Sequence, residues 1–288
     1  MVTWHTYEPC AGEDIQRPPL HNFLRILALA FAVCLLQPEV SPASAATQRS
    51  TRSVEIRTFS VPADVCPSSI SFGETIQCSI VSTGEVDVYT FTASAGDKVL
   101  VRSSKSSGNL WPGIRVLLGA TELCQAGSSM TAEIASCSLP SAGTYTVLVL
   151  DAFSGTYTGD YYLYLQRLNN PGNAIHIEHG RVLVGSITTP AEMDTFVFTS
   201  SAGRKALVKM RKSSGSLWPG VRVYGPDGTK LCEESSSITA VIPDCSIPST
   251  GTYAILAYDS FNGTYTGDYH LYLDCCDVYL PIVRGANQ

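Results

Sequence analysis

The chain has 288 residues, enough for two ordinary domains or one large one. Hydrophobic residues make up 44% and charged residues 15% of it, a globular balance in which strand-forming Val, Thr and Tyr are prominent and long helix-forming stretches are absent. The formal net charge of −6 argues against a nucleic-acid-binding protein, which would present a basic surface.

The first 46 residues have the pattern of an export leader. Arg25 precedes an apolar run over residues 26–36, and residues 42–46 contain an A-x-A cleavage pattern. The run is short beside the ~20 residues of a membrane-spanning helix. We therefore expect a cleaved signal peptide within residues 1–46, with an uncleaved anchor as the alternative. The mature protein is then secreted, extracellular or on the cell surface, without a membrane span.

Most of the remaining sequence is an internal repeat. The first matching segments are offset by 107 positions, and one inserted residue makes the offset 108 in the later ones. A period of this length corresponds to one β-sandwich rather than to a solenoid unit. The matching segments are 87–96 with 194–203, 105–116 with 212–223, and 155–161 with 263–269.

The repeat determines the domain organisation that we expect. The two copies are separated by Asn-Asn-Pro-Gly-Asn, a string of turn-forming residues. Each copy has its own set of expected strands, so the two domains are expected to be independently stable. The expected parts are the leader at 1–46, a linker at 47–64, a first domain at 65–168, a linker at 169–174, a second domain at 175–274 and a C-terminal tail at 275–288.

Alternating apolar and polar residues predict strands in both repeats. Tyr145, Val147 and Val149 share one face of an expected strand, and Tyr269 and Leu271 share a face in the second repeat. Turn residues punctuate the chain about every 8–12 residues, and no helical segment lies between the strands. The sequence therefore predicts an all-β fold of two tandem antiparallel β-sandwich domains.

The cysteines support export and predict disulfides. Cys124 and Cys137 are 13 residues apart, as are Cys232 and Cys245 at the equivalent places. Closing such a loop contributes about 3 kcal/mol in the chain-entropy model; the alternative is that these are small buried thiols. We also count Cys66 and Cys78 among the disulfide cysteines. Their partners stay open, as do those of the adjacent Cys275 and Cys276.

No residue pattern predicts an enzyme. His176, Glu178 and His179 superficially resemble a metal site, but on a strand His179 points away from the other two. His270 lies on the more polar face of an expected strand. The sequence has no G-x-S-x-G elbow and no H-E-x-x-H motif. We therefore expect a non-catalytic protein.

Four aspartates are the only candidates for a cofactor site. Each pair brackets a glycine-containing loop, and hard oxygen ligands on such a loop favour Ca²⁺. The alternative is that each aspartate caps a turn through its own backbone. Two carboxylates fall short of the six to eight oxygens that calcium takes, so we favour the structural role. The pairs are Asp151 with Asp160, and Asp259 with Asp268.

Each repeat carries Ser-Gly-x-Leu-Trp-Pro-Gly on a turn that enters a strand. If Trp111 and Trp218 face solvent, they form a bivalent aromatic surface suited to sugars or fibrous proteins. Arg115 and Arg222 would then supply hydrogen bonds. The alternative, which we favour, is that each tryptophan plugs the end of its sandwich together with the preceding leucine.

The sequence resembles the bacterial pre-peptidase C-terminal domain. The resemblance rests on DVYTFTASAGDKVLVR at 87–102, LPSAGTYTV at 139–147 and TGDY at 158–161. In the second copy it rests on YGPDGT at 224–229 and IPSTGTY at 247–253. It implies two tandem jelly-roll-like sandwiches of a non-catalytic kind that is appended to exported bacterial enzymes. Some members of that family bind calcium or fibrous substrates such as collagen.

These observations favour a secreted bacterial accessory or binding protein. The expected partner is an extracellular polysaccharide or protein, a component of the envelope, or a secreted enzyme. The alternative is a stand-alone structural protein of the cell envelope that binds no small ligand. Neither hypothesis involves nucleic acid.

Overall fold

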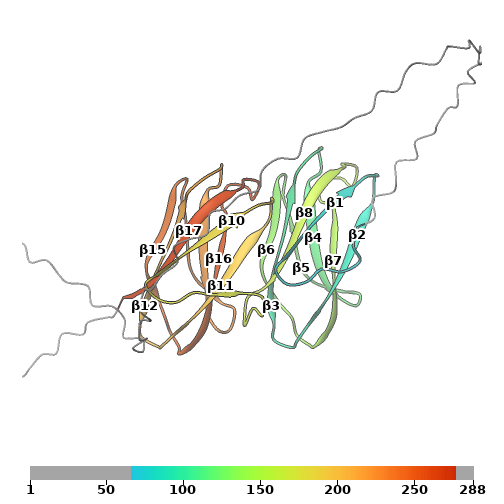
Figure 1. Ribbon diagram of the computed structural model, residues 1–288. Coiled ribbons are helices and arrows are strands. Elements are labelled where there is room, and N and C mark those ends of the chain that lie inside the picture. The colour runs from blue at the N-terminus through green and yellow to red at the C-terminus, as the bar shows by residue number, and fades with distance from the viewer. Residues whose placement is uncertain (1–65, 277–288) are drawn as a thin grey trace, which may run out of the picture. The chain divides into compact units, whose positions relative to one another are not determined.

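The computed structural model describes residues 66–276. This range contains strands β1 to β17 and no helix (Figure 1). The expected signal peptide, the linker at 47–64 and nearly all of the C-terminal tail lie outside the described residues. Within residues 66–276 there is no helix that could cross a membrane.

The first repeat forms a sandwich of two four-stranded antiparallel sheets, ordered β1-β8-β3-β6 and β2-β7-β4-β5. Most connections pass from one sheet to the other, which gives a jelly-roll-like winding. The strands are β1 (Glu74–Ile80), β2 (Val86–Ala93), β3 (Lys98–Lys105), β4 (Pro112–Leu118), β5 (Thr121–Gly127), β6 (Thr131–Ser138), β7 (Gly143–Asp151) and β8 (Gly159–Arg167).

The second repeat has the same strand order in its two sheets, β10-β17-β12-β15 and β14-β13-β16-β11-β9. Strand β9 pairs in parallel with β11, and the first repeat has an isolated parallel bridge, Ser69 with Thr90, at the equivalent place. The strands are β9 (Ile175–His176), β10 (Arg181–Ile187), β11 (Met193–Ser200), β12 (Lys205–Lys212), β13 (Pro219–Tyr224), β14 (Lys230–Ser235), β15 (Thr239–Ser246), β16 (Gly251–Asp259) and β17 (Gly267–Cys276).

Each sandwich is closed by the residues whose alternation predicted the strands. Tyr145, Val147 and Val149 on β7 are fully buried, and Tyr269 and Leu271 on β17 are buried in the second core. Alternate residues of a strand point to opposite faces, so each sheet turns one face toward its partner sheet. The prediction of an all-β fold made of antiparallel sandwiches is confirmed.

Disulfides join the two sheets of each sandwich at equivalent places. Cys124 on β5 bonds Cys137 on β6, and Cys232 on β14 bonds Cys245 on β15, with Cα–Cα distances of 6.0 and 5.9 Å. These are the two pairs that the equal spacing predicts. A further disulfide links Cys66 to Cys78 on β1, the pairing that the sequence left open. Cys275 is also disulfide-bonded.

A third buried cluster contains residues from both repeats. The two sandwiches belong to one compact unit. The Tyr164 hydroxyl, in the first sandwich, donates a hydrogen bond of 2.9 Å to the carbonyl of Met193 in the second. Burial of this apolar surface stabilises the pair of sandwiches together. The cluster consists of Leu100, Tyr164, Leu168, Ala191, Met193, Tyr224, Ala254, Leu256 and Tyr258.

Alternating charges cross the same interface. Arg222 Nη1 lies 2.7 Å from Glu133 Oε1, and Arg222 Nε lies 2.6 Å from Glu233 Oε1. Arg102 Nε lies 3.6 Å from Glu133 Oε2. Burial acts to lower the pKa of Arg222, but Glu133 and the other groups around the guanidinium, including Glu233, together outweigh it and the pKa is raised. Glu133 therefore holds two buried guanidinium groups, one from each sandwich.

Candidate functional site

The turn that carries each tryptophan is built by a close crossing of two backbone segments. Gly108 has φ of 72°, and a Cβ atom there would lie 2.5 Å from the carbonyl oxygen of Thr158. The same Thr158 carbonyl accepts hydrogen bonds of 3.0 Å from the amides of Asn109 and Leu110. The loop after β3 is thereby fixed against the loop that precedes β8.

The second repeat has the same crossing. A Cβ atom on Gly215 would lie 2.5 Å from the Thr266 carbonyl oxygen. That carbonyl accepts hydrogen bonds of 3.0 Å from the amides of Ser216 and Leu217. Both repeats therefore present the following tryptophan in one defined backbone geometry.

The leucine and the tryptophan of this turn have different environments. Leu110 and Leu217 are fully buried, whereas Trp111 is 36% and Trp218 is 38% exposed. The interpretation that both residues plug the end of the sandwich therefore holds for the leucines only. Each indole is partly presented to solvent.

In the first sandwich Trp111 is part of a group of three rings, of which Trp111 and Phe153 are exposed and Tyr157 is half-buried. Its ring centroid lies 4.7 Å from that of Phe153, which lies 5.4 Å from that of Tyr157 in a stacked arrangement. Phe153 is 59% exposed. We call Trp111, Phe153 and Tyr157 the first aromatic cluster.

The second sandwich repeats this group with Trp218, Phe261 and Tyr265. The Trp218 and Phe261 centroids are 4.8 Å apart, and those of Phe261 and Tyr265 are 5.1 Å apart. Phe261 is 39% exposed. We call these three residues the second aromatic cluster. Only the two tryptophans were candidates from the sequence, although both tyrosines stand in the repeated Gly-Thr-Tyr segment.

One aspartate organises the first cluster. The Asp151 carboxylate, at the end of β7, accepts hydrogen bonds from the backbone amides of Trp111, Ser154, Thr156 and Tyr157. Burial acts to raise the pKa of Asp151, but these amide donors outweigh it and the pKa is lowered. One side chain therefore positions the segments that carry all three rings.

Asp259 has the same role in the second cluster. Its carboxylate accepts hydrogen bonds of 3.0 to 3.1 Å from the amides of Trp218, Thr264 and Tyr265. Burial raises the pKa of Asp259, against the effect of these donors. Asp259 therefore caps its loop through the backbone, which is the structural alternative for these aspartates.

The other two aspartates hold serines of the tryptophan turn. Asp160 accepts hydrogen bonds of 2.6 Å from the hydroxyls of Ser79 and Ser107, and these bonds lower its pKa. Asp268 accepts one of 2.7 Å from Ser214. Protein donors thus occupy the proposed calcium ligands. In the described range, the only group of three or more metal-binding side chains is Cys66, Cys78 and Asp87, and its two cysteines are bonded to each other.

The two arginines do not have equivalent surroundings. Arg115 lies on β4, is exposed and forms an ion pair of 3.6 Å with Glu122. Arg222, by contrast, is buried between the sandwiches against Glu133 and Glu233. The assignment of Arg222 to a ligand surface is therefore wrong, because the second sandwich uses this face to pack on the first.

The three histidines lie on different segments of the second sandwich. His176 lies on the short strand β9, and His179 Nε2 lies 3.3 Å from the carbonyl oxygen of Thr199. His270 lies on β17 beside Arg211. Within residues 66–276, none of these histidines belongs to a group that could hold a metal ion.

Comparison with known proteins connects the first sandwich with one domain family. The family model described as the bacterial pre-peptidase C-terminal domain matches residues 85–151, from β2 to β7. No curated protein matches the chain.

Solved structures match the chain with low similarity. One is the pair of tandem CBM51 modules from Sp3GH98, a family 98 glycoside hydrolase of Streptococcus pneumoniae; the match has 10% identity, covers 68% of this chain and 84% of that one, and has a TM-score of 0.22. Another is the M60 catalytic domain with two CBM51 domains from Clostridium perfringens ZmpB, with 10% identity, 69% and 34% coverage and a TM-score of 0.22. The chain thus spans about a third of the ZmpB structure.

Proposed function

We propose that the protein is a secreted, non-catalytic binding protein whose two aromatic clusters contact an extracellular polymer. The observation that carries this proposal is that the same group of three rings, with an exposed tryptophan and phenylalanine, is built twice, by the same turn and an equivalent aspartate. Large aromatic side chains are normally buried, and an exposed group of them marks a contact surface.

The chemistry of the clusters favours a ligand with repeating flat or apolar faces. Indole, phenyl and phenol rings stack on such faces and lose little conformational entropy, since each side chain has only two rotatable bonds. A polymer can occupy both clusters at once, so the second contact is intramolecular and raises the overall affinity. Polysaccharides and fibrous proteins both have this repeating character.

An accessory role agrees with the family match. The pre-peptidase C-terminal domain is a non-catalytic appendage of exported enzymes, and we propose that the second sandwich is another copy of it. The disulfides fit an oxidising compartment outside the cytosol. We propose on this basis that the protein acts on the cell exterior by placing itself, or an enzyme that it accompanies, on the polymer.

The test is binding of the purified protein to insoluble cellulose, chitin, peptidoglycan and collagen fibres in a sedimentation assay. We expect retention on at least one of these polymers. The variants Trp111→Ala and Trp218→Ala should each weaken retention, because one cluster is left to bind the polymer alone. The double variant has neither contact and should not be retained.

The control is Ile238→Ala, which removes another exposed apolar side chain, one outside both clusters. It should leave retention unchanged. Thermal unfolding must stay close to wild type in the tryptophan variants, since partly exposed rings contribute less to stability than buried ones. Retention that is indifferent to both tryptophans, or absent for all four polymers, would contradict the proposed function.

A further inference from the structure

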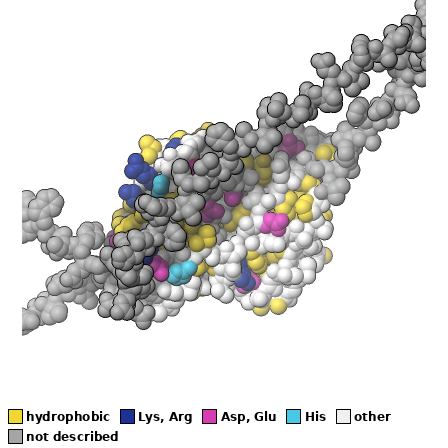
Figure 2. Space-filling model, in the orientation of Figure 1, with side chains coloured by type: hydrophobic (Ala, Val, Ile, Leu, Met, Phe, Trp, Pro, Cys, Tyr) yellow, Lys and Arg dark blue, Asp and Glu magenta, His cyan; other side chains and the backbone are white. Residues whose placement is uncertain are grey.

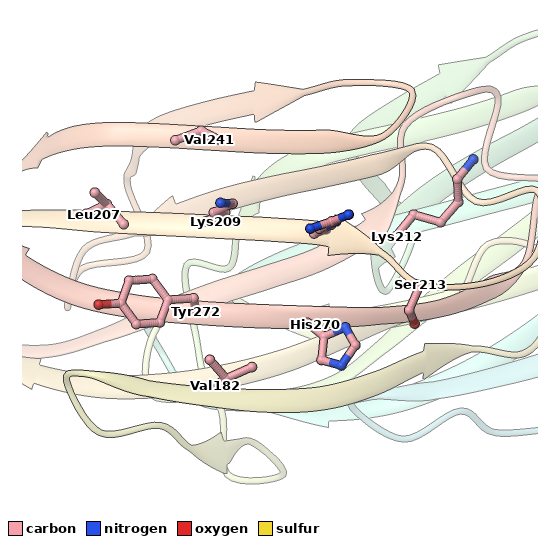
Figure 3. A pocket seen from close by; sticks show the side chains of 9 residues that line it. Val182, Leu207, Lys209, Lys212, Ser213, Val241, His270 and Tyr272 are labelled. Carbon is pink, nitrogen blue, oxygen red and sulfur yellow. The ribbon is translucent and has the colours of Figure 1, made fainter.

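The outer face of the sheet β10-β17-β12-β15 has no second layer over it within the described residues. Figure 3 shows its side chains spread across the sheet, with Lys209 on β12 between Val241 and Tyr272. Residues in register form two rows across the four strands. The rows are Val182, Tyr272, Lys209 and Val241, and then Val184, His270, Arg211 and Thr239.

The first sandwich shows how the equivalent face is used. There the middle of the same two rows lies under the second sandwich, where Tyr164 joins the shared apolar cluster and Arg102 meets Glu133 and the carbonyl of Asp259, whereas Gln77 is exposed. This face is therefore a docking face in one copy of the repeat. The rows are Thr75, Tyr164, Arg102 and Glu133, and then Gln77, Tyr162, Ser104 and Thr131.

The uncovered face is more apolar than the covered one at three positions. Val182, Val184 and Val241 are 55%, 73% and 40% exposed. A sheet face directed at solvent normally carries polar residues at such positions. Valine is instead found where the equivalent face of the first sandwich has a polar residue. The equivalent pairs are Thr75 and Val182, Gln77 and Val184, and Glu133 and Val241.

The uncovered face is also cationic. Lys209, Arg211 and Lys212 line a hollow over the sheet together with His270 (Figure 3). No ion pair joins any of these three cations to an acid in the described range. In Figure 2, Lys and Arg side chains gather beside hydrophobic ones at the end of the molecule formed by this sheet. The place of Glu133, which neutralises the covered face, is taken by Val241.

These charges disfavour a second copy of the chain as the occupant. The interface between the sandwiches joins two different faces, so repeating it between chains would set the β4 face of one copy on this sheet of another. Arg115 would then stand where Arg222 stands, opposite Lys209 and without the carboxylate of Glu133. Like charges at a buried contact oppose association.

We propose that the outer face of β10-β17-β12-β15 is a docking surface for an acidic protein surface that also carries apolar side chains. Carboxylates of the partner would pair with Lys209 and Arg211, and its apolar side chains would cover Val182, Val184 and Val241. The surface shares no residue with the aromatic clusters, so it is independent of the proposed polymer contact.

The probes are a random copolymer of glutamate and tyrosine, which supplies carboxylates and apolar rings, and sodium alginate, a polyuronate. Binding to the full chain is measured by isothermal titration calorimetry at low and at physiological salt. We expect the copolymer to bind, and the double variant Lys209→Gln/Arg211→Gln to lower its affinity by about tenfold or more. The matched control, Lys105→Gln/Arg115→Gln, removes the same charge from the first sandwich and should not alter binding.

A second pair of substitutions separates the apolar part of the contact. Val182→Ser/Val184→Ser replaces exposed valines by serine, so the fold should be retained, as checked by thermal unfolding. This variant should lose affinity for the copolymer while keeping its charge.

Three results would overturn the proposal. The first is no copolymer binding at low salt, or equal binding by the Lys209 and Arg211 variant. The second is an affinity for alginate that equals the affinity for the copolymer and is unchanged by the valine substitutions, which would assign the face to an acidic glycan. The third is a dimer in sedimentation equilibrium that the valine changes abolish, which would assign the face to a second copy.

Discussion

Arg102 in the first sandwich donates a hydrogen bond of 2.9 Å from Nη2 to the backbone carbonyl of Asp259 in the second. Asp259 in turn holds the amides of Trp218 and Tyr265 through its carboxylate. The interface between the sandwiches therefore supports the loop that presents the second aromatic cluster. The first cluster has no such support from another sandwich within the described residues, and its phenylalanine is the more exposed of the two.

Removing the charge of Glu133 should destabilise the whole described unit. In Glu133→Gln the buried Arg102 and Arg222 lose the carboxylate that they share, which we expect to cost about 3 kcal/mol of unfolding free energy. Urea denaturation measures the loss. The control Glu122→Gln breaks an exposed pair with Arg115 and should cost under about 1 kcal/mol. Equal small losses would mean that the interface charges contribute little.

Separating the two sandwiches should lower the stability of each. The chains 66–168 and 169–276 would expose the apolar cluster that they share, and Arg222 would lose Glu133. The unfolding midpoint of each half should therefore lie below that of the intact chain, contrary to the expectation of two independently stable domains. Denaturation of the halves and of the whole under one condition is the measurement. Halves as stable as the whole would restore that expectation.

Asp194 should give the chain a pH-dependent stability. Burial raises its pKa to about 6 from an ordinary value of 3.8, against the hydrogen bond from Tyr269. The folded chain then holds this proton more tightly than the unfolded chain, so the contribution to stability falls as pH rises from about 4 to about 6. Asp194→Asn should remove that slope, as measured by unfolding free energy against pH. The exposed Asp244→Asn should keep it, and a slope unchanged by Asp194→Asn would exclude this residue as its source.

Asp151 should prove to be a structural residue and not a calcium ligand. Asp151→Ala leaves several backbone amides without their acceptor, at an expected cost of about 1–3 kcal/mol, and should also weaken polymer retention by disordering the first cluster. Calcium in millimolar excess, or EDTA, should leave the melting temperature of the wild-type protein unchanged. A fall in melting temperature with EDTA, reversed by calcium, would instead support the metal site.

The local structure could be predicted from the sequence because alternation and spacing are local signals. The equal spacing of the cysteines indicated which of them join the sheets, and Leu110 was correctly expected to plug the sandwich. Phe153 and Tyr157 were missed as ring partners of Trp111, because they lie about forty residues away along the chain. The repeated Gly-Thr-Tyr segment was the available signal.

The contact between the sandwiches was not predicted, and this led to the wrong assignment of Arg222. A repeat assigns equivalent places to Arg115 and Arg222, but it does not tell which copy has a given face covered. One signal was present in β8, where Tyr161, Leu163, Tyr164 and Leu165 are all buried. An unbroken apolar run of this kind indicates a strand that is covered on both faces.

The backbone crossing at Gly108 has a consequence for how the two copies could diverge. A side chain at Gly108 or Gly159 would collide with the facing main chain. A side chain at Gly215 or Gly267 would collide with the main chain in the same way in the second repeat. A substitution on one strand of the crossing cannot be relieved by a change on the other, since both contacts are to main-chain atoms. Divergence between the copies is therefore excluded at these four glycines, and the turn around Trp218 has stayed almost letter for letter the same as the turn around Trp111.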